Sequence, residues 1–179
     1  GFGITGDDFV VKIVDQGLHR WLPERWRPGR GSDDVVVGIP HGPIAIDTTL
    51  PMGNNPQGTV VHPDGATTYV AHSADSVAVI DAATQTVVDT ITVGYAPNGL
   101  AISADGARLF AANEGDDSIS IVDTVSRAVI ATVGVGQNPE ALAVSPDGAT
   151  LYVANAQDDT VSVIDTVSAT VTATVNVGN

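Results

Sequence analysis

The chain has 179 residues, of which 43% are hydrophobic, so it can bury a core and is not a disordered polypeptide. Its formal net charge is −14, and residues 31–179 hold two basic side chains against seventeen acidic ones, which argues against binding to nucleic acid or an anionic membrane. The absence of cysteine excludes disulfides and Cys-ligated metals, and no apolar run reaches the roughly 18 to 20 residues of a membrane span.

The N-terminal region contains two segments with the alternating pattern of strands, GDDFVVKIVDQ (6–16) and SDDVVVGI (32–39). They bracket HRWLPERWRPGR (19–30), which holds both tryptophans and four of the seven basic residues. We therefore predict a β-hairpin with a Trp/Arg-rich loop over residues 1–43, ending in the linker sequence PHGP. The two segments resemble the last two strands of bacterial immunoglobulin-like or cadherin-like domains.

A second alignment of residues 32–53 remains open. SDDVVVGI also lies 41 residues before SADSVAVI, and Gly53 lies 41 residues before Gly94, so both segments match the repeat that follows. Residues 32–53 would then be half of a repeat unit. We favour the hairpin because PHGP is typical of a link between modules, and we take residues 44–53 as a lone outer strand.

The rest of the chain repeats one pattern in three units, at residues 54–94, 95–136 and 137–179. The third unit shows four short runs with strand chemistry, LAVS, LYVAN, TVSVID and TVTATVNV. Turn signals separate them, and Ser145-Pro146-Asp147-Gly148 fits a type I turn that ends on a left-handed glycine. Tandem four-stranded units of about this length are typical of β-propeller blades.

The expected fold is therefore all-β, a partial β-propeller of about three four-stranded blades (44–179) after the N-terminal β-hairpin. The segments ATLYVANAQDDTVSVIDT and NPEALAVSPDGATLYVAN resemble the YVTN-type β-propeller repeat of bacterial and archaeal cell-surface proteins, and more distantly lactonase-type seven-bladed propellers. The motif occurs as YVAN, FAAN and YVAH at residues 152–155, 110–113 and 69–72. The resemblance implies an extracellular or cell-surface protein that acts in adhesion, scaffolding or ligand binding.

Three blades do not make a closed ring, because closed propellers have about four to eight. Each blade buries its faces against two neighbours, so three units leave apolar faces uncovered. We expect these faces to be covered by further blades of a longer parent chain or by self-association.

Two regions are candidate binding sites. The loops that enter the innermost strands face the channel of a propeller, and the residues that vary after the recurring proline there are Gln57, Asn98 and Glu140. The Trp/Arg loop could bind a protein, a cell-wall glycan or another surface through side chains that stack and form bidentate contacts, or its tryptophans could serve only in packing. Its candidate residues are Arg20, Trp21, Arg25, Trp26 and Arg27.

The paired aspartates Asp116-Asp117 and Asp158-Asp159 lack the spacing of a calcium loop, so we expect them to act in turns through their own backbone. The chain has no Cys nucleophile and no G-x-S-x-G motif. We therefore expect a non-catalytic protein with no cofactor and no metal. The alternative is a fragment of a propeller enzyme, lactonase-like or quinoprotein-like.

Overall fold

The structure, a computed structural model, describes residues 34–36, 49–51, 55–72 and 74–178. The chain divides into two compact units, Gly1–Pro56 and Gln57–Asn179. The five candidate residues of the Trp/Arg loop, Arg20, Trp21, Arg25, Trp26 and Arg27, lie outside the described residues. The first strand of the predicted hairpin (6–16) lies outside them as well, so the hairpin stays a prediction.

Two short strands of the first unit, β1 (Asp34–Val36) and β2 (Thr49–Pro51), pair antiparallel, with Val35 opposite Leu50. The half-blade alignment of residues 32–53 expects these two segments to pair, with Val36 and Leu50 in the places of Val77 and Ile91 of the next repeat. The structure pairs the two segments, but its register differs from that alignment by one residue.

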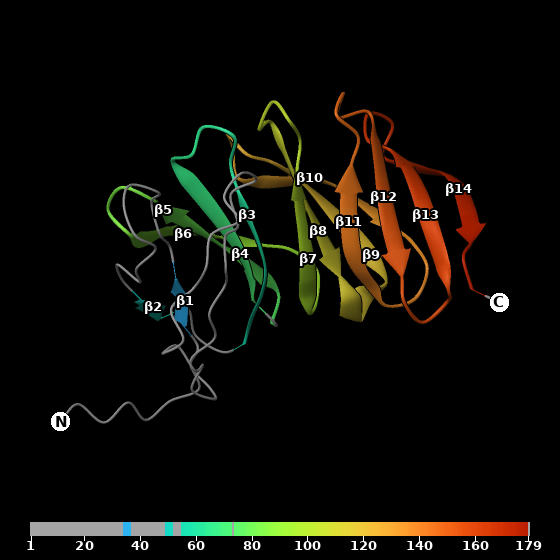
Figure 1. The fold of residues 1–179 in the computed structure, drawn as a ribbon, viewed down its shortest axis with the longest axis horizontal. Coiled ribbons are helices and arrows are strands. Elements are labelled where there is room, and N and C mark those ends of the chain that lie inside the picture. Colours follow the sequence, from blue (N-terminus) through green and yellow to red (C-terminus); the bar gives the residue numbers. More distant parts are fainter. Residues whose placement is uncertain (1–33, 37–48, 52–54, 73, 179) are drawn as a thin grey trace, which may run out of the picture. The chain divides into compact units, whose positions relative to one another are not determined.

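Three four-stranded antiparallel sheets follow, each with its strands in chain order. Blade 1 consists of β3 (Pro56–Val61), β4 (Thr67–His72), β5 (Ser76–Asp81) and β6 (Thr86–Thr92). Blade 2 consists of β7 (Pro97–Ile102), β8 (Arg108–Asn113), β9 (Ser118–Asp123) and β10 (Ala128–Gly134). Blade 3 consists of β11 (Pro139–Val144), β12 (Thr150–Asn155), β13 (Thr160–Asp165) and β14 (Thr170–Asn176). The all-β class and the partial propeller of three four-stranded blades are thus confirmed, and Figure 1 shows the blades side by side, from green through yellow to red.

The turns follow the chemistry expected from the sequence. Gly148 has φ +72° and donates its N–H to the Ser145 carbonyl at 2.8 Å, which closes the predicted turn on a left-handed glycine. Gly65 and Gly106 have φ +70° and +75° at the same place in blades 1 and 2. A side chain is strained at such φ values, so glycine fixes this turn in every blade.

The blades pack face to face through alternating strand residues. Blade 2 turns Leu109, Ala111 and Val122 toward blade 1, where they join one apolar cluster with Tyr69, Val77, Val79 and Ile91. On its other side it turns Phe110, Ile119, Ile121 and Val133 toward Leu151, Val153 and Ile164 of blade 3. Because successive residues of a strand point to opposite faces, one strand pattern supplies both interfaces. We call the surface with Phe110 the leading face of blade 2, and the surface with Leu109 its trailing face.

Candidate functional site

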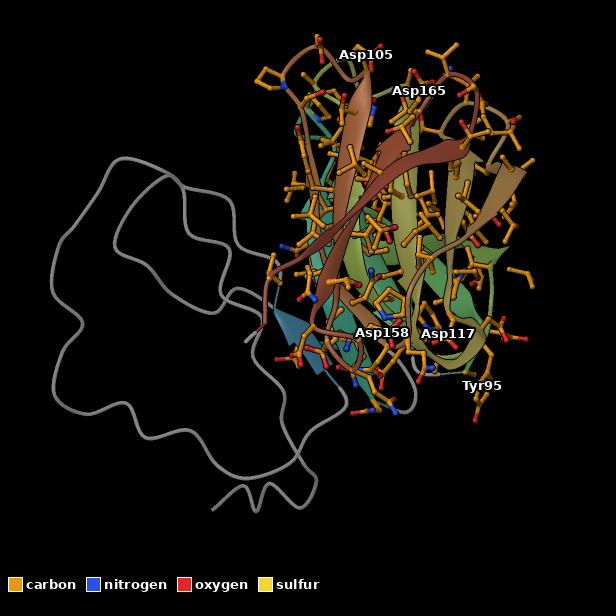
Figure 2. The ribbon with its side chains drawn as sticks, turned by 90° about the vertical axis from the view of Figure 1, so that its right-hand side faces the viewer. Tyr95, Asp105, Asp117, Asp158 and Asp165 are labelled. Carbon is orange, nitrogen blue, oxygen red and sulfur yellow. The ribbon has the colours of Figure 1, made fainter. Side chains whose placement is uncertain are left out.

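Each blade has two ends with different connections. At one end, here called the linker end, lie the linkers between blades (residues 94–96 and 136–138) and the turns between second and third strands (residues 114–117 and 156–159). The remaining turns lie at the opposite end, here called the turn end. Figure 2 shows Tyr95, Asp117 and Asp158 together at the linker end and Asp105 and Asp165 at the turn end.

The three predicted ligand residues lie at the linker end on neighbouring inner strands. Gln57, Asn98 and Glu140 are each the second residue of their strand, in β3, β7 and β11. The inner strands approach so closely that a Cβ added to Gly58 would overlap the Asn98 carbonyl oxygen, and one added to Gly99 would overlap the Glu140 carbonyl oxygen. The structure therefore brings the three positions into one row along the inner edge of the blades.

Two of these side chains have hydrogen-bond partners within the chain. The Asn98 Nδ2 donates to Oε2 of Glu114 at 3.2 Å, and Glu140 Oε1 accepts from Asn138 Nδ2 at 2.8 Å. Glu140 is exposed, whereas Gln57 and Asn98 are partly buried. The row thus presents oriented amide and carboxylate groups at the linker end, which can form hydrogen bonds with a polar partner.

The paired aspartates lie in turns as the sequence predicted, where Asp117 and Asp159 have left-handed backbones at φ +48° and +53°, and three of their side chains also bind the linkers. Asp116 Oδ2 accepts from the Tyr95 N–H at 2.7 Å, and Asp117 Oδ1 accepts from the Asn138 N–H at 2.9 Å. These two linkers precede and follow blade 2, so one turn clamps both. Asp158 accepts from the Gln137 N–H at 2.8 Å in the same way. The sequence did not predict these linker contacts, because the partners lie 21 residues away and meet the turn only after the blade folds.

Sequence reasoning also missed a role for the asparagine that ends the YVAN and FAAN motifs. Asn113 is fully buried, donates from Nδ2 to the hydroxyls of Ser118 and Ser120, and accepts at Oδ1 from the Gly94 N–H at 3.1 Å. A Cβ on Gly94 would lie 2.5 Å from Asn113 Cγ, so glycine is needed for this approach. The recurrence of Asn and Gly at equivalent positions of the repeat was the available signal.

The linker end is acidic. Its described carboxylates come from all three blades, at Asp75, Glu114, Asp116, Asp117, Glu140, Asp158 and Asp159. The two arginines of the described residues are engaged at the turn end, where Arg108 Nη1 donates to the Thr166 carbonyl at 2.7 Å and Arg127 pairs with Asp89 at 2.8 Å. The linker end therefore repels anions and attracts cations.

Carboxylates at the turn end are held ionised by their own turns. The backbone N–H of Thr84, Ser126 and Ser168, in blades 1, 2 and 3, lowers the pKa of Asp81, Asp123 and Asp165, respectively. The side chain of each aspartate closes its turn: the Ser126 N–H donates to Asp123 Oδ1 at 2.7 Å, and the Ser168 N–H donates to Asp165 Oδ1 at 2.7 Å. Their role is structural, since hydrogen bonds to the ionised form fix each turn.

A shallow crevice of about 450 Å³ lies between the end of β10 with the linker after it and strands β13 and β14 of blade 3. Gly134 leaves open space in the crevice, because no atom lies within 4 Å of a Cβ placed on it. The equivalent residue of blade 1 is Thr92, which has a side chain. Its lining combines hydroxyl groups, one carboxylate and backbone, at Gly134, Val135, Gly136, Asp158, Thr160, Ser162, Val171 and Thr174. The hydroxyls of Thr160 and Ser162 already accept hydrogen bonds from Asn155.

Two further findings concern metal-binding groups and membrane-spanning helices. Within the described ranges, no three His, Cys, Asp or Glu side chains are grouped so that they could hold a metal ion. The described part of the chain likewise contains no helix that is long and apolar enough to span a membrane.

Comparisons with known proteins agree on the fold. Residues 100–178 match the family model of YNCE-like β-propellers. Hydrazine synthase of Kuenenia stuttgartiensis is 34% identical with a TM-score of 0.65, over 66% of this chain and 35% of that chain. A functionally unknown protein from Desulfotomaculum acetoxidans is 24% identical with a TM-score of 0.61, over 70% of this chain and 43% of that one. No curated protein matches the sequence.

The chain thus spans well under two thirds of the length of these two solved proteins. The likeness extends to 1041 solved chains, and propellers carry many unrelated activities, so the fold does not select a function. The family match, the solved structures and the three tandem sheets together identify the chain as a β-propeller repeat protein.

Proposed function

We propose that this chain is a non-catalytic β-propeller module of a secreted or cell-surface protein, in which stiff blades present the linker end to a partner protein or a cell-wall glycan. The observation that carries the proposal is the double clamp by Asp116 and Asp117 on the linkers before and after blade 2. A loop that is already ordered loses less conformational entropy on binding than a flexible loop does. The clamped linker end can therefore bind a partner at a lower entropic cost.

The linker end also offers an aromatic contact. Tyr95 is 62% exposed, and its ring packs over Gly115, where an added Cβ would overlap Tyr95 Cδ1. Asn98 reaches the same turn, because its Nδ2 donates to Oε2 of Glu114, the residue before Gly115. A flat aromatic ring next to amide and carboxylate groups suits a sugar or a protein side chain, because it combines apolar contact with hydrogen bonding.

The test of this proposal is a binding measurement on the full chain. Isolated cell-wall glycan and extracted surface proteins of the source organism are the probes, and saturable binding to one of them is expected. The double variant Tyr95→Ala with Asn98→Ala should weaken that binding about tenfold or more, since hot-spot aromatics contribute about 1.4 kcal/mol or more.

The matched control is Val125→Ala at the turn end, where Val125 is 89% exposed and distant from the linkers. It should leave binding unchanged. Equal loss of binding in the control and the double variant, or no saturable binding to either probe, contradicts the proposal.

The location has its own test. Antibodies against the chain should label intact source cells as strongly as permeabilised cells, or detect the protein in the medium. Labelling that requires permeabilisation would replace the surface role with an intracellular one.

The second candidate is a fragment of a propeller enzyme, lactonase-like or quinoprotein-like, and the likeness to a hydrazine synthase, an enzyme, is the observation in its favour. An activity of the parent protein that disappears in the Tyr95→Ala and Asn98→Ala variant, with no binding of glycan or surface protein, would favour this candidate.

A further inference from the structure

Two differences separate the junction of blades 2 and 3 from the junction of blades 1 and 2. The outer strand ends on Thr92 in blade 1 but on Gly134 in blade 2. Asn113 Oδ1 accepts from the Gly94 N–H at 3.1 Å, whereas Asn155 Oδ1 is buried and accepts no hydrogen bond within the described part of the chain. The crevice of about 450 Å³ lies at the junction that lacks both the side chain and this hydrogen bond.

The wall of the crevice presents hydroxyl groups that can donate hydrogen bonds. Thr160 Oγ1 and Ser162 Oγ each accept from Asn155 Nδ2, at 3.0 and 2.9 Å. Because a hydroxyl group has one proton and two lone pairs, each of them keeps its proton for another acceptor. Thr174, which is paired with Ser162 on the next strand, adds a third hydroxyl to the lining. The crevice therefore offers several hydrogen-bond donors on adjacent strands.

The same crevice offers hydrogen-bond acceptors on either side of Gly136. A Cβ added to Gly136 would lie 2.8 Å from both Asn155 Cγ and Asp158 Oδ2, so the amide and the carboxylate both adjoin this lining residue. Asp158 is exposed, and its Oδ2 is held in place by the Gln137 N–H at 2.8 Å. A ligand in the crevice must therefore donate hydrogen bonds as well as accept them.

This combination of groups discriminates between classes of ligand. An anion is repelled by Asp158 and by the acidic linker end. An ammonium group can bind Asp158, but it has no lone pair to accept from the Thr160 and Ser162 hydroxyls. Sugar hydroxyls both donate and accept, and the CH groups of a sugar ring can contact Val135 and Val171, which also line the crevice. A neutral sugar is thus the class that satisfies the lining.

We propose that the crevice between the end of β10 and strands β13 and β14 is a binding site for one neutral sugar ring. Its volume of about 450 Å³ lies within the range of about 300 to 1,000 Å³ that is typical of small-molecule sites. The site shares no lining residue with the Tyr95 and Asn98 surface. The proposal is therefore independent of the binding role proposed above, and the two can fail separately.

The experiment titrates the full chain with three neutral hexoses, glucose, galactose and mannose, and follows the backbone amide resonances by NMR. Gly134 and Gly136 line the crevice, so their amides report binding there directly. At least one hexose should shift both resonances saturably, with a Kd of the order of millimolar. Gly94, at the equivalent place in the preceding linker, should not shift. Glucuronate should bind about tenfold more weakly or less, because Asp158 repels its carboxylate.

Two substitutions remove single groups from the crevice. Thr174→Val replaces a hydroxyl by a methyl group and should raise the Kd of the hexose about threefold or more. Asp158→Asn should raise it about tenfold or more and abolish the discrimination against glucuronate. The matched controls are Thr90→Val, at the equivalent position of blade 1, and Asp75→Asn, which removes a charge from the linker end of blade 1. Both controls should leave the Kd unchanged.

Three results would overturn the sugar site. The first is the absence of a saturable shift at Gly134 and Gly136 with any of the three hexoses up to about 100 mM, a concentration that nearly saturates a millimolar site. The second is equal weakening by the crevice variants and their controls, which would place the bound sugar elsewhere. The third is binding of glucosamine about tenfold or more tighter than glucose, which would assign the crevice to an ammonium group.

Discussion

Blades 2 and 3 have almost the same strand pattern but different surroundings. Blade 2 has a neighbour on each side, and Phe110 on its leading face is fully buried. Blade 3 has a neighbour on its trailing face, so Leu151 is fully buried while Tyr152, the next residue, is 47% exposed. The comparison shows that the repeat determines which face a side chain points to, and that the neighbouring blade determines whether it is buried.

The largest expected difference between the two blades is in their leading-face aromatics. Phe110→Ala should lower the free energy of unfolding by about 3 to 5 kcal/mol, because it removes a fully buried ring and leaves a cavity. Tyr152→Ala should cost about 1 kcal/mol or less, since that side chain is half exposed. Chemical denaturation of both variants measures the difference, and equal losses would mean that the leading face of blade 3 is covered in solution.

A smaller difference is expected for the asparagines of the motif. Asn113→Ala should cost about 1 to 3 kcal/mol, because it leaves the Gly94 N–H and the buried Ser118 and Ser120 hydroxyls without their partner. Asn155→Ala should cost less, since Asn155 donates to Thr160 and Ser162 hydroxyls but its buried Oδ1 accepts no hydrogen bond from the protein. Thermal denaturation of the two variants provides the comparison. A larger loss for Asn155→Ala would show that this oxygen has a partner in solution.

The smallest expected difference between the two blades is in their loss of stability at low pH, which should be alike in both. The pKa values of Asp123 and Asp165 lie below the ordinary value of 3.8, mainly because the backbone N–H groups of Ser126 and Ser168 bind the ionised carboxylates. The folded pKa is the lower one, so this stabilisation is complete above pH 3.8 and is lost as the pH falls through the folded value. Asp123→Asn and Asp165→Asn should therefore reduce, by equal amounts, the fall of the melting temperature as the pH is lowered through the acid range. A stronger effect in one blade would show that its turn depends on a neighbour.

Much of the fold could be predicted because it depends on local sequence patterns that occur in all three repeat units. Alternating Val, Ile and Thr predicts the strands, and Gly148 predicts the left-handed turn that the structure has at φ +72°. Gln57, Asn98 and Glu140 were expected in the loops that enter the inner strands, and the structure has each of them as the second residue of such a strand. Its role as a binding site stays a prediction.

The clamps at the linker end could not be predicted in the same way. Asp117 and Asn138 are 21 residues apart, and no local rule joins a turn to the backbone of a linker at that separation. The Gly94 N–H meets Asn113 only because blades 1 and 2 stack at a fixed distance. Contacts of this kind depend on the relative position of two sheets, which strand periodicity does not specify.

The amino-acid sequence by itself thus determined the strand pattern, the turns and the two faces of every blade, because these follow from steric preferences and side-chain alternation within about forty residues. Only the tertiary structure decided which faces are covered, how Asp116 and Asp117 hold two linkers, and that Gly58 and Gly99 lie where inner strands meet. These features arise from the packing of one blade against another, which the strand pattern of a single repeat does not specify.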